Sequence, residues 1–180
     1  MINDIREILI PEDKLQIKIL ELGKRISDDY SGSNPLLISV LKGSVVFMSD
    51  LMRAISIPCE IDFLAVSSYG KGSKSSGVVK ILKDLDRDIS GRDIILVEDI
   101  LDSGLTLSYL LEILNTRNAA SINICTLLDK PSRHRVDIRP KYTGFTIPDE
   151  FVVGFGLDFD EKYRNLPYIG ILKSELIPSE

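Results

Sequence analysis

Short apolar runs alternate with helical segments along most of this chain, and this alternation is the feature that most restricts its fold. Leu36 to Leu41 is a continuous apolar run with one serine, short enough to be a strand buried on both faces. Asp93 to Val97 and Ser121 to Leu128 are further strand-like runs, and the helical segment Leu105 to Leu114 lies between them. Strands separated by helices favour right-handed crossovers. We therefore expect an α/β fold with a mainly parallel, twisted sheet flanked by helices and with ligands at the carboxyl ends of its strands.

Two more helices and a hairpin are expected in the first half of the chain. Apolar residues recur every three or four positions between Leu15 and Ile26, which predicts an amphipathic helix, and a second helix is expected from about Val45 to Ala54. Glu60 to Tyr69 and Val78 to Leu82 are typical of strands. The octet between them, Gly70 to Gly77, holds only Gly, Ser and Lys and is expected to be a flexible loop.

The C-terminal part has a different pattern. From Tyr142 onwards, short strands such as Phe151 to Val153 and Tyr168 to Leu172 alternate with turns. We expect residues 142–180, with part of the N-terminus, to form a small hood subdomain over the sheet. With 180 residues and a hydrophobic fraction of 44%, residues 1–180 are expected to form a single globular domain.

Composition excludes several classes of protein. The chain has 27 acidic and 22 basic residues, and its net charge of -5 argues against a nucleic-acid partner. No apolar run approaches the length of a bilayer span, and the N-terminus lacks a basic start and an apolar signal core, so we expect a cytoplasmic protein with no membrane partner. Cys59 and Cys125 lie apart in apolar surroundings, which favours buried thiols over a disulfide or a zinc site.

Local charge leaves one ambiguity. The segment from Lys71 to Arg92 holds six bases against three acids, so it either meets an anion or is a solvated loop and strand edge. The only histidine, His134, lies between two arginines after Pro131. We expect it in a surface loop, where it is a poor catalytic base or metal ligand.

The segment from Asp93 to Thr106 carries the strongest chemical signal, because it is typical of a strand, a polar loop and a helix start. Ser103, Gly104 and Thr106 present hydroxyls and free backbone N–H groups at the helix N-terminus, where an anion such as phosphate is favoured. Three acids precede them, Glu98, Asp99 and Asp102. Acids repel phosphate unless they face sugar hydroxyls or Mg²⁺.

The combination therefore predicts a phosphorylated sugar as the ligand, and the alternative is a well-capped helix with acids near its start. No GxxxxGK[ST] or GxGxxG motif is present, so the sequence gives no support for a P-loop or a dinucleotide site.

The run from Val97 to Thr106 resembles the phosphoribosyl-diphosphate signature of type I phosphoribosyltransferases. Three other segments resemble, in order and spacing, the hypoxanthine (guanine) phosphoribosyltransferases within that family. These are Leu41-Lys42-Gly43, then Ser67-Ser68-Tyr69-Gly70 with Ser75-Ser76-Gly77, and then Phe151 to Asp158 with Tyr163-Arg164-Asn165-Leu166-Pro167. The likeness covers about Leu36 to Leu172. It implies the type I phosphoribosyltransferase fold, an enzyme of purine salvage, and Mg²⁺ as cofactor.

The resemblance also implies roles for the acidic run and the helix start. Glu98 and Asp99 would hold the ribose hydroxyls and a magnesium ion that they share. Asp102 would lie by purine N7 and act as general base. Ser103, Gly104, Leu105 and Thr106 would surround the 5′-phosphate. Two departures are small: Ser103 stands where many relatives have threonine, and Leu105 replaces a lysine that some relatives carry.

Roles for the purine and the diphosphate follow in the same way. Lys130 would hydrogen-bond the purine 6-oxo group, Phe151 would stack on the ring, and the backbone of Val152 would meet its edge. Asp158 would complete the purine site and support a second Mg²⁺. The diphosphate would meet Arg164 and the backbone around Lys42 and Gly43, and Ser68 and Tyr69 would belong to a mobile loop that closes over the reaction.

The implied reaction transfers the phosphoribosyl group of 5-phospho-α-D-ribosyl 1-diphosphate to hypoxanthine or guanine, giving IMP or GMP and diphosphate. Two alternatives keep the fold: a pyrimidine-type phosphoribosyltransferase, and a nucleotide-sensing regulator that binds RNA. A third is a catalytically idle binding module. The family is usually a homodimer or homotetramer, and the resemblance makes the surface around Lys42 to Arg53 a candidate contact.

Overall fold

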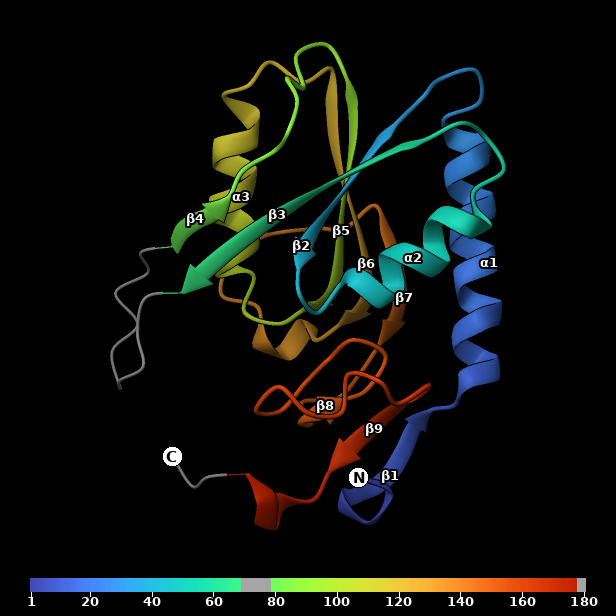
Figure 1. Ribbon diagram of the computed structural model, residues 1–180, viewed down its shortest axis with the longest axis vertical. Coiled ribbons are helices and arrows are strands. Elements are labelled where there is room, and N and C mark those ends of the chain that lie inside the picture. Colours follow the sequence, from blue (N-terminus) through green and yellow to red (C-terminus); the bar gives the residue numbers. More distant parts are fainter. Residues whose placement is uncertain (69–78, 178–180) are drawn as a thin grey trace.

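The computed structural model describes residues 1–68 and 79–177 of the chain, and its elements are arranged as in Figure 1. In chain order the main elements are β1 (Ile5–Ile10), α1 (Glu12–Asp29), β2 (Leu36–Leu41), α2 (Val45–Ala54), β3 (Glu60–Ser68), β4 (Val79–Lys83), β5 (Asp93–Leu101), α3 (Leu105–Asn115), β6 (Ser121–Asp129), β7 (Tyr142–Thr146), β8 (Val152–Val153) and β9 (Ile169–Leu172). Short 3₁₀ turns occur at Ile2–Asp4, Pro131–Arg133 and Ser174–Leu176.

The main sheet has six strands in the order β4-β3-β2-β5-β6-β7. All neighbouring pairs are parallel except β3 and β4, which are antiparallel. The expected α/β fold is therefore confirmed. From β2 the chain builds β3 on one side of that strand and later β5 on the other, so the order reverses between β2 and β5. The carboxyl ends of these two strands flank the crevice where open α/β sheets bind ligands.

Helices cover both faces of this sheet. Along β5, Ile95 and Val97 pack in one core with α1 and α2, whereas Ile94 and Leu96 pack in a second core with α3. This alternation follows from the two-residue period of a strand. Figure 1 shows α1 and α2 on one side of the sheet and α3 on the other. The continuous apolar runs are needed because both faces are buried.

A second sheet of three antiparallel strands, β1-β9-β8, joins the two ends of the chain (Figure 1). A separate core lies beneath it, formed by Val153, Tyr163, Leu166 and Leu172. The structure corrects the expected boundary of the hood, because β7 belongs to the main sheet. Tyr142 pairs with Cys125 of β6 and is fully buried there. The second sheet therefore takes its C-terminal strands from residue 152 onwards.

Most other expected elements are present with shifted ends. The first helix is longer at both ends than its apolar repeat, and β5 and β6 extend beyond the apolar runs that predicted them. Cys125 is buried as expected, but Cys59 is only partly buried, and both are free thiols. The expected loop at Gly70 to Gly77 and the residue Tyr69 lie outside the described residues. None of the described helices is long and apolar enough to span a membrane.

Candidate active site at the carboxyl ends of the strands

The acidic run belongs to the end of β5. Glu98 and Asp99 were expected in a polar loop, but the strand continues through them to Leu101. Backbone pairing with β6 explains the difference, since Glu98 lies opposite Thr126 and Leu101 lies opposite Asp129. Ladder hydrogen bonds with a long neighbouring strand override the low strand propensity of acidic residues. Both carboxylates are therefore held on a rigid element.

A tight turn joins β5 to α3. Gly104 is the N-cap residue and adopts a φ of 78°, a conformation that L side chains rarely take. A Cβ there would also lie 2.7 Å from Cγ2 of Val136, so both the backbone conformation and the neighbouring side chain favour glycine. Helix α3 begins at Leu105, whose backbone N–H donates to Oγ of Ser103 at 3.4 Å. The first turn of a helix leaves backbone N–H groups without partners inside the helix, and these are available to an anion at this turn.

A pocket of about 110 Å³ lies at this turn. Five residues predicted to bind the phosphoribosyl group or the purine line the pocket, and three apolar residues complete the lining. The five are Glu98, Asp102, Ser103, Gly104 and Thr106, and the three are Ile100, Leu101 and Leu107. Leu105 is 42% exposed and does not line the pocket. The structure thus brings five of the predicted residues together, around a helix N-terminus that favours an anion.

Burial sets the electrostatics of the two strand acids. Glu98 is buried, and burial, followed by the charge of Asp99, raises its pKa well above the usual value. Burial raises the pKa of Asp99 to about 6, even though the backbone N–H groups of Ile100 and Asp99 and the charge of Arg164 lower it. Two carboxyl groups in such surroundings are stabilised in their charged form by a cation.

Asp99 also touches the chain at the end of β2. A Cβ on Gly43 would lie 1.8 Å from Oδ2 of Asp99, and a Cβ on Gly156 would lie 2.0 Å from the backbone oxygen of Gly43. The peptide bond between Leu41 and Lys42 is cis. Gly156, which follows β8, therefore packs directly on the β2 turn, and the β2 turn packs on Asp99. These contacts cross the point where the strand order reverses.

Arg164 completes this part of the crevice. Its Nη1 donates to the backbone oxygen of Gly156 at 2.8 Å, and its Nη2 lies 2.9 Å from Oδ1 of Asp158 and 3.4 Å from Glu161. The side chain of Lys42 donates to the same Glu161 carboxylate at 3.1 Å. The sequence had not singled out Glu161. It joins the side chains of Lys42 and Arg164, two residues predicted to bind the diphosphate, Lys42 through its backbone.

The predicted purine residues lie beyond Asp102. Lys130 follows β6, is 8% exposed, and donates from Nζ to the backbone oxygen of Glu150 at 2.6 Å. This bond ties the end of β6 to the segment before β8. Phe151 is 38% exposed and packs edge to face on Phe159, with ring centroids 5.5 Å apart, while Val152 is buried in β8. An exposed ring beside a buried lysine offers a surface for a planar heterocycle.

Asp102 has an ion-pair partner that the sequence had not identified. Nε of Arg133 donates to Oδ1 of Asp102 at 3.1 Å, and Nη1 of Arg133 lies 3.7 Å from Asp149. His134 lies in the connection between β6 and β7, where the sequence placed it, but its side chain is only 21% exposed and its Nε2 lies 2.7 Å from Oδ1 of Asp129. The sequence around Pro131 gave no signal for the pairing of Arg133 with Asp102 or of His134 with Asp129.

The carboxylates at the site fit Mg²⁺ that is shared with a substrate. Within the described ranges, no group of three or more His, Cys, Asp or Glu side chains could hold a metal by itself. Mg²⁺ keeps several waters and is usually bound by one or two carboxylates plus substrate phosphates. Glu98 and Asp99 at the end of β5 meet that requirement, and so does Asp158. The side chain of Ser68 and all of Tyr69 lie outside what the structure describes.

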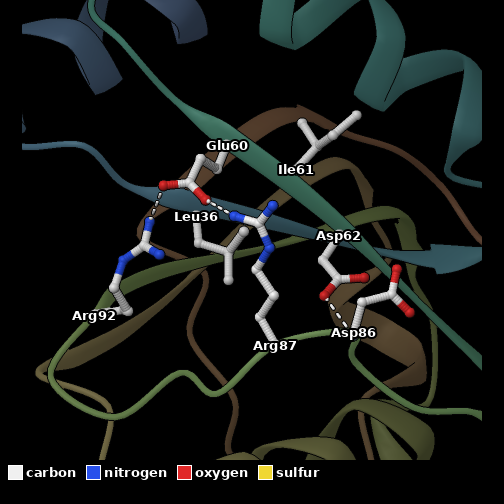
Figure 2. Close-up of a pocket in the computed structure, with 7 residues that line it drawn as sticks. All are labelled: Leu36, Glu60, Ile61, Asp62, Asp86, Arg87 and Arg92. Atoms are coloured by element: carbon white, nitrogen blue, oxygen red, sulfur yellow. Dashed lines mark hydrogen bonds and ion pairs between the residues drawn. The ribbon is translucent and has the colours of Figure 1, made fainter.

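A second hollow, of about 240 Å³, lies at the opposite, amino ends of β2 and β3 (Figure 2). Its charged groups pair with one another. Glu60 accepts hydrogen bonds from Arg87 at 3.0 Å and Arg92 at 2.9 Å, and the buried Asp62 accepts one from the backbone N–H of Asp86 at 2.8 Å. These bonds hold the β4–β5 connection against β3. We interpret this hollow as structural, so two of the bases between Lys71 and Arg92 serve the fold.

Comparison with known proteins agrees with this geometry. The family model for the phosphoribosyl transferase domain matches residues 10–160. The hypoxanthine-guanine phosphoribosyltransferase of Bacillus subtilis is 54% identical over 179 residues, which is 99% of both chains. A hypoxanthine phosphoribosyltransferase from Staphylococcus aureus superimposes with a TM-score of 0.96 at 49% identity, covering 99% of this chain and 97% of that one.

The bifunctional protein TilS/HprT of Listeria monocytogenes is 54% identical over 98% of this chain, which spans only 27% of that relative's length. The part shared by all three relatives contains the β5 strand end, the α3 turn and the segment around Arg164. The family model matches residues 10–160, and the B. subtilis protein is 54% identical over nearly the full length of both chains. The chain therefore belongs to the phosphoribosyl transferase domain family.

Proposed function

We propose that this protein is a purine salvage enzyme that transfers the phosphoribosyl group of 5-phospho-α-D-ribosyl 1-diphosphate to a 6-oxopurine, hypoxanthine or guanine. The observation that carries the proposal is the pocket at the start of α3, where a helix N-terminus lies beside the buried carboxyl group of Glu98 at the end of β5. Phosphate suits the helix end, and sugar hydroxyls suit the acids. The names of the B. subtilis and S. aureus relatives support the same reaction.

In this proposal the turn binds the phosphoribosyl group. Ser103, Gly104, Leu105 and Thr106 surround the 5′-phosphate with backbone N–H groups and hydroxyls. Glu98 and Asp99 accept hydrogen bonds from the ribose hydroxyls. Their rigid place on β5 supports this role, because a transfer at the anomeric carbon requires the ribose to be held in one orientation.

The purine lies between Phe151 and the end of β6. Phe151 stacks on its ring, the backbone of Val152 and Asp158 meet its edge, and Lys130 donates to the 6-oxo group. An ammonium has three donors and Lys130 gives one to Glu150, so donors remain for a purine oxygen. Lys130 disfavours adenine, whose 6-amino group is itself a donor.

The leaving diphosphate meets Arg164, Lys42 and the backbone at Gly43. The buried Nε of Arg164 has no hydrogen-bond partner among the residues that the structure describes, which supports this assignment because it can donate to a phosphate oxygen. Mg²⁺, held by Glu98, Asp99 and Asp158 together with the substrate, would supply charge neutralisation for the diphosphate.

The transfer breaks the bond between the anomeric carbon and diphosphate and forms a bond from that carbon to purine N9. Positive charge develops on the ribose and negative charge on the diphosphate, so electrostatic positioning lowers the barrier. Asp102 accepts the proton that the purine loses at N7. General-base help of this kind contributes about 10²- to 10⁴-fold.

The second sheet would act as a hood over this crevice, and we expect a homodimer or homotetramer in the cytoplasm. Two free cysteines support a reducing compartment. Ser68 and Tyr69 remain predicted members of the loop that closes over the substrates.

The test is an assay of diphosphate release from 5-phospho-α-D-ribosyl 1-diphosphate with Mg²⁺, with hypoxanthine, guanine, xanthine, adenine and uracil offered separately. We expect release with hypoxanthine or guanine and little with adenine or uracil. Release with uracil alone would favour a pyrimidine enzyme. An absence of release with every base, combined with binding of nucleotide or RNA, would favour a regulator of the same fold.

A further inference from the structure

Four charged residues form a chain along one side of the proposed purine site. Asp102 lies at one end, with Oδ1 3.1 Å from Nε of Arg133. The Nη1 of Arg133 is 3.7 Å from Oδ2 of Asp149, and Oδ1 of Asp149 is 4.0 Å from Nζ of Lys130 at the other end. The charges alternate in sign along the chain. The two end residues are those proposed to contact the purine, and the two middle residues have no role so far.

We propose that Arg133 is a positioning residue for the purine. Its guanidinium holds the carboxylates of Asp102 and Asp149 at fixed places on either side of it. The proposal rests on the proposed function. In a 6-oxopurine, N7 and O6 lie on the same edge of the ring. Asp102 and Lys130 would therefore read one edge together, and their relative position decides how well both contacts form at once.

Arginine suits this task because its planar group presents five donors in a fixed arrangement. Two different nitrogens of Arg133 face two different carboxylates, which a lysine ammonium on a flexible stem matches poorly. Without the guanidinium, Asp102 and Asp149 would lie near each other as like charges, which is unfavourable when the purine excludes water. The hydrogen bond engages Oδ1 of Asp102, and the second carboxylate oxygen keeps acceptor capacity for the purine.

The exposure of the Arg133–Asp102 pair indicates that the pair contributes more to the reaction than to the stability of the fold. The side chains of Arg133 and Asp102 are 47% and 43% exposed, and exposed ion pairs contribute little to stability. The proposed purine would cover Asp102 and part of the pair, which strengthens the interaction by removing solvent. We therefore expect substitution of Arg133 to change turnover of the purine far more than it changes thermal stability.

The experiment compares Arg133→Gln, Arg133→Lys and the control Arg139→Gln. Arg139 lies in the same connection between β6 and β7, is 86% exposed, and pairs with Asp137, which is 82% exposed. Steady-state kcat and KM are measured for hypoxanthine and separately for 5-phospho-α-D-ribosyl 1-diphosphate, with melting temperatures for each variant.

For Arg133→Gln we expect kcat/KM for hypoxanthine to fall about tenfold, as for other coupled charged contacts, with KM for the phosphoribosyl donor changed less than about twofold. Arg133→Lys should recover less than half of the loss on a logarithmic scale, and Arg139→Gln should match wild type. If Arg133→Gln does not fold, Asp149→Asn is expected to raise KM for hypoxanthine in the same way.

Three results would overturn the proposal: Arg133→Gln with wild-type kcat/KM for hypoxanthine, full recovery by Arg133→Lys, or an equal loss toward both substrates. If Asp149→Asn serves as the replacement variant, wild-type KM for hypoxanthine is the overturning result. The proposed function fails separately, since a wild-type protein without diphosphate release would remove it before any variant is compared.

Discussion

The contact between Gly43 and Asp99 leads to a sharp prediction for Gly43→Ala. The new Cβ would lie 1.8 Å from Oδ2 and 2.9 Å from Cγ of Asp99, whereas ordinary contacts lie at 3.4–4 Å. Asp99 must therefore turn or the β2 turn must move. Turning Asp99 is resisted, because Oδ1 accepts a hydrogen bond from the backbone N–H of Ile100 at 2.8 Å. Moving the turn is resisted by Gly156, which packs on the backbone oxygen of Gly43.

The expected magnitudes follow from these two resistances. An off-rotamer side chain costs about 0.5–1.5 kcal/mol, and loss of one hydrogen bond costs about the same. We expect Gly43→Ala to lower the free energy of unfolding by about 1–2 kcal/mol. The effect on turnover is expected to be larger, about 10²-fold, since a shift of about 1 Å at a group that orients substrate has that effect.

The assay is a double-mutant cycle that combines Gly43→Ala with Asp99→Ala, in which urea unfolding measures the free energy of unfolding of each variant. Removal of the carboxylate removes the atoms that the new Cβ meets, so Gly43→Ala should cost at least about 0.5 kcal/mol less in the Asp99→Ala background than in wild type. An equal cost in both backgrounds would show that the strain lies elsewhere, and the argument from close approach would be wrong.

Three further predictions concern single side chains. Asp102→Asn should lower kcat by about 10²-fold or more with KM for the phosphoribosyl donor nearly unchanged, and equal turnover would remove Asp102 as general base. Lys130→Met should lower kcat/KM for hypoxanthine about 10- to 100-fold, the effect of losing a charged hydrogen bond, and an unchanged base preference measured by competition would contradict it. A hydrogen bond from Tyr142 at 2.7 Å, followed by one from Lys141, lowers the pKa of Asp29, so its stabilisation is present at neutral pH and is lost as pH falls below about 4. Urea unfolding should show Asp29→Asn less stable than wild type by under about 1 kcal/mol at pH 7, with a difference that shrinks progressively as the pH is lowered below about 4, and a constant difference would refute this.

The sequence predicted the central strands and helices because their apolar periods are long and uninterrupted. It predicted β5 only to Val97, because acidic residues interrupt the apolar signal while the backbone continues to pair with β6. It gave no sign of β1 as a strand, since the partner of Ile5 is Leu172, at the far end of the chain. Pairing across such a separation depends on tertiary structure, which local pattern does not encode.

The candidate site shows the same division. Ser103, Gly104 and Thr106 are consecutive or nearly so, and their chemistry is visible in the sequence. The contact of Gly43 with Asp99 is different, because it depends on β2 and β5 being neighbours in the sheet. The pair formed by Arg133 and Asp102 depends on how the chain turns after Lys130. The family resemblance assigned the segments around Gly43 and Asp99 to one site, but it gave no role to Arg133, Asp149 or Glu161.

Three acids close together in sequence, Glu98, Asp99 and Asp102, end in three different environments, and this separation is what allows one strand end to serve several roles. Glu98 is buried with a raised pKa, and Asp99 is half-buried and lies near Arg164. Asp102 is 43% exposed and pairs with Arg133. A carboxylate that receives a proton from a passing substrate must be accessible, whereas carboxylates that orient a ribose through a shared cation gain from a rigid, buried position. The strand holds the first two acids in the ladder and the third lies in the turn, so in the proposed function the boundary between β5 and α3 divides substrate binding from proton transfer.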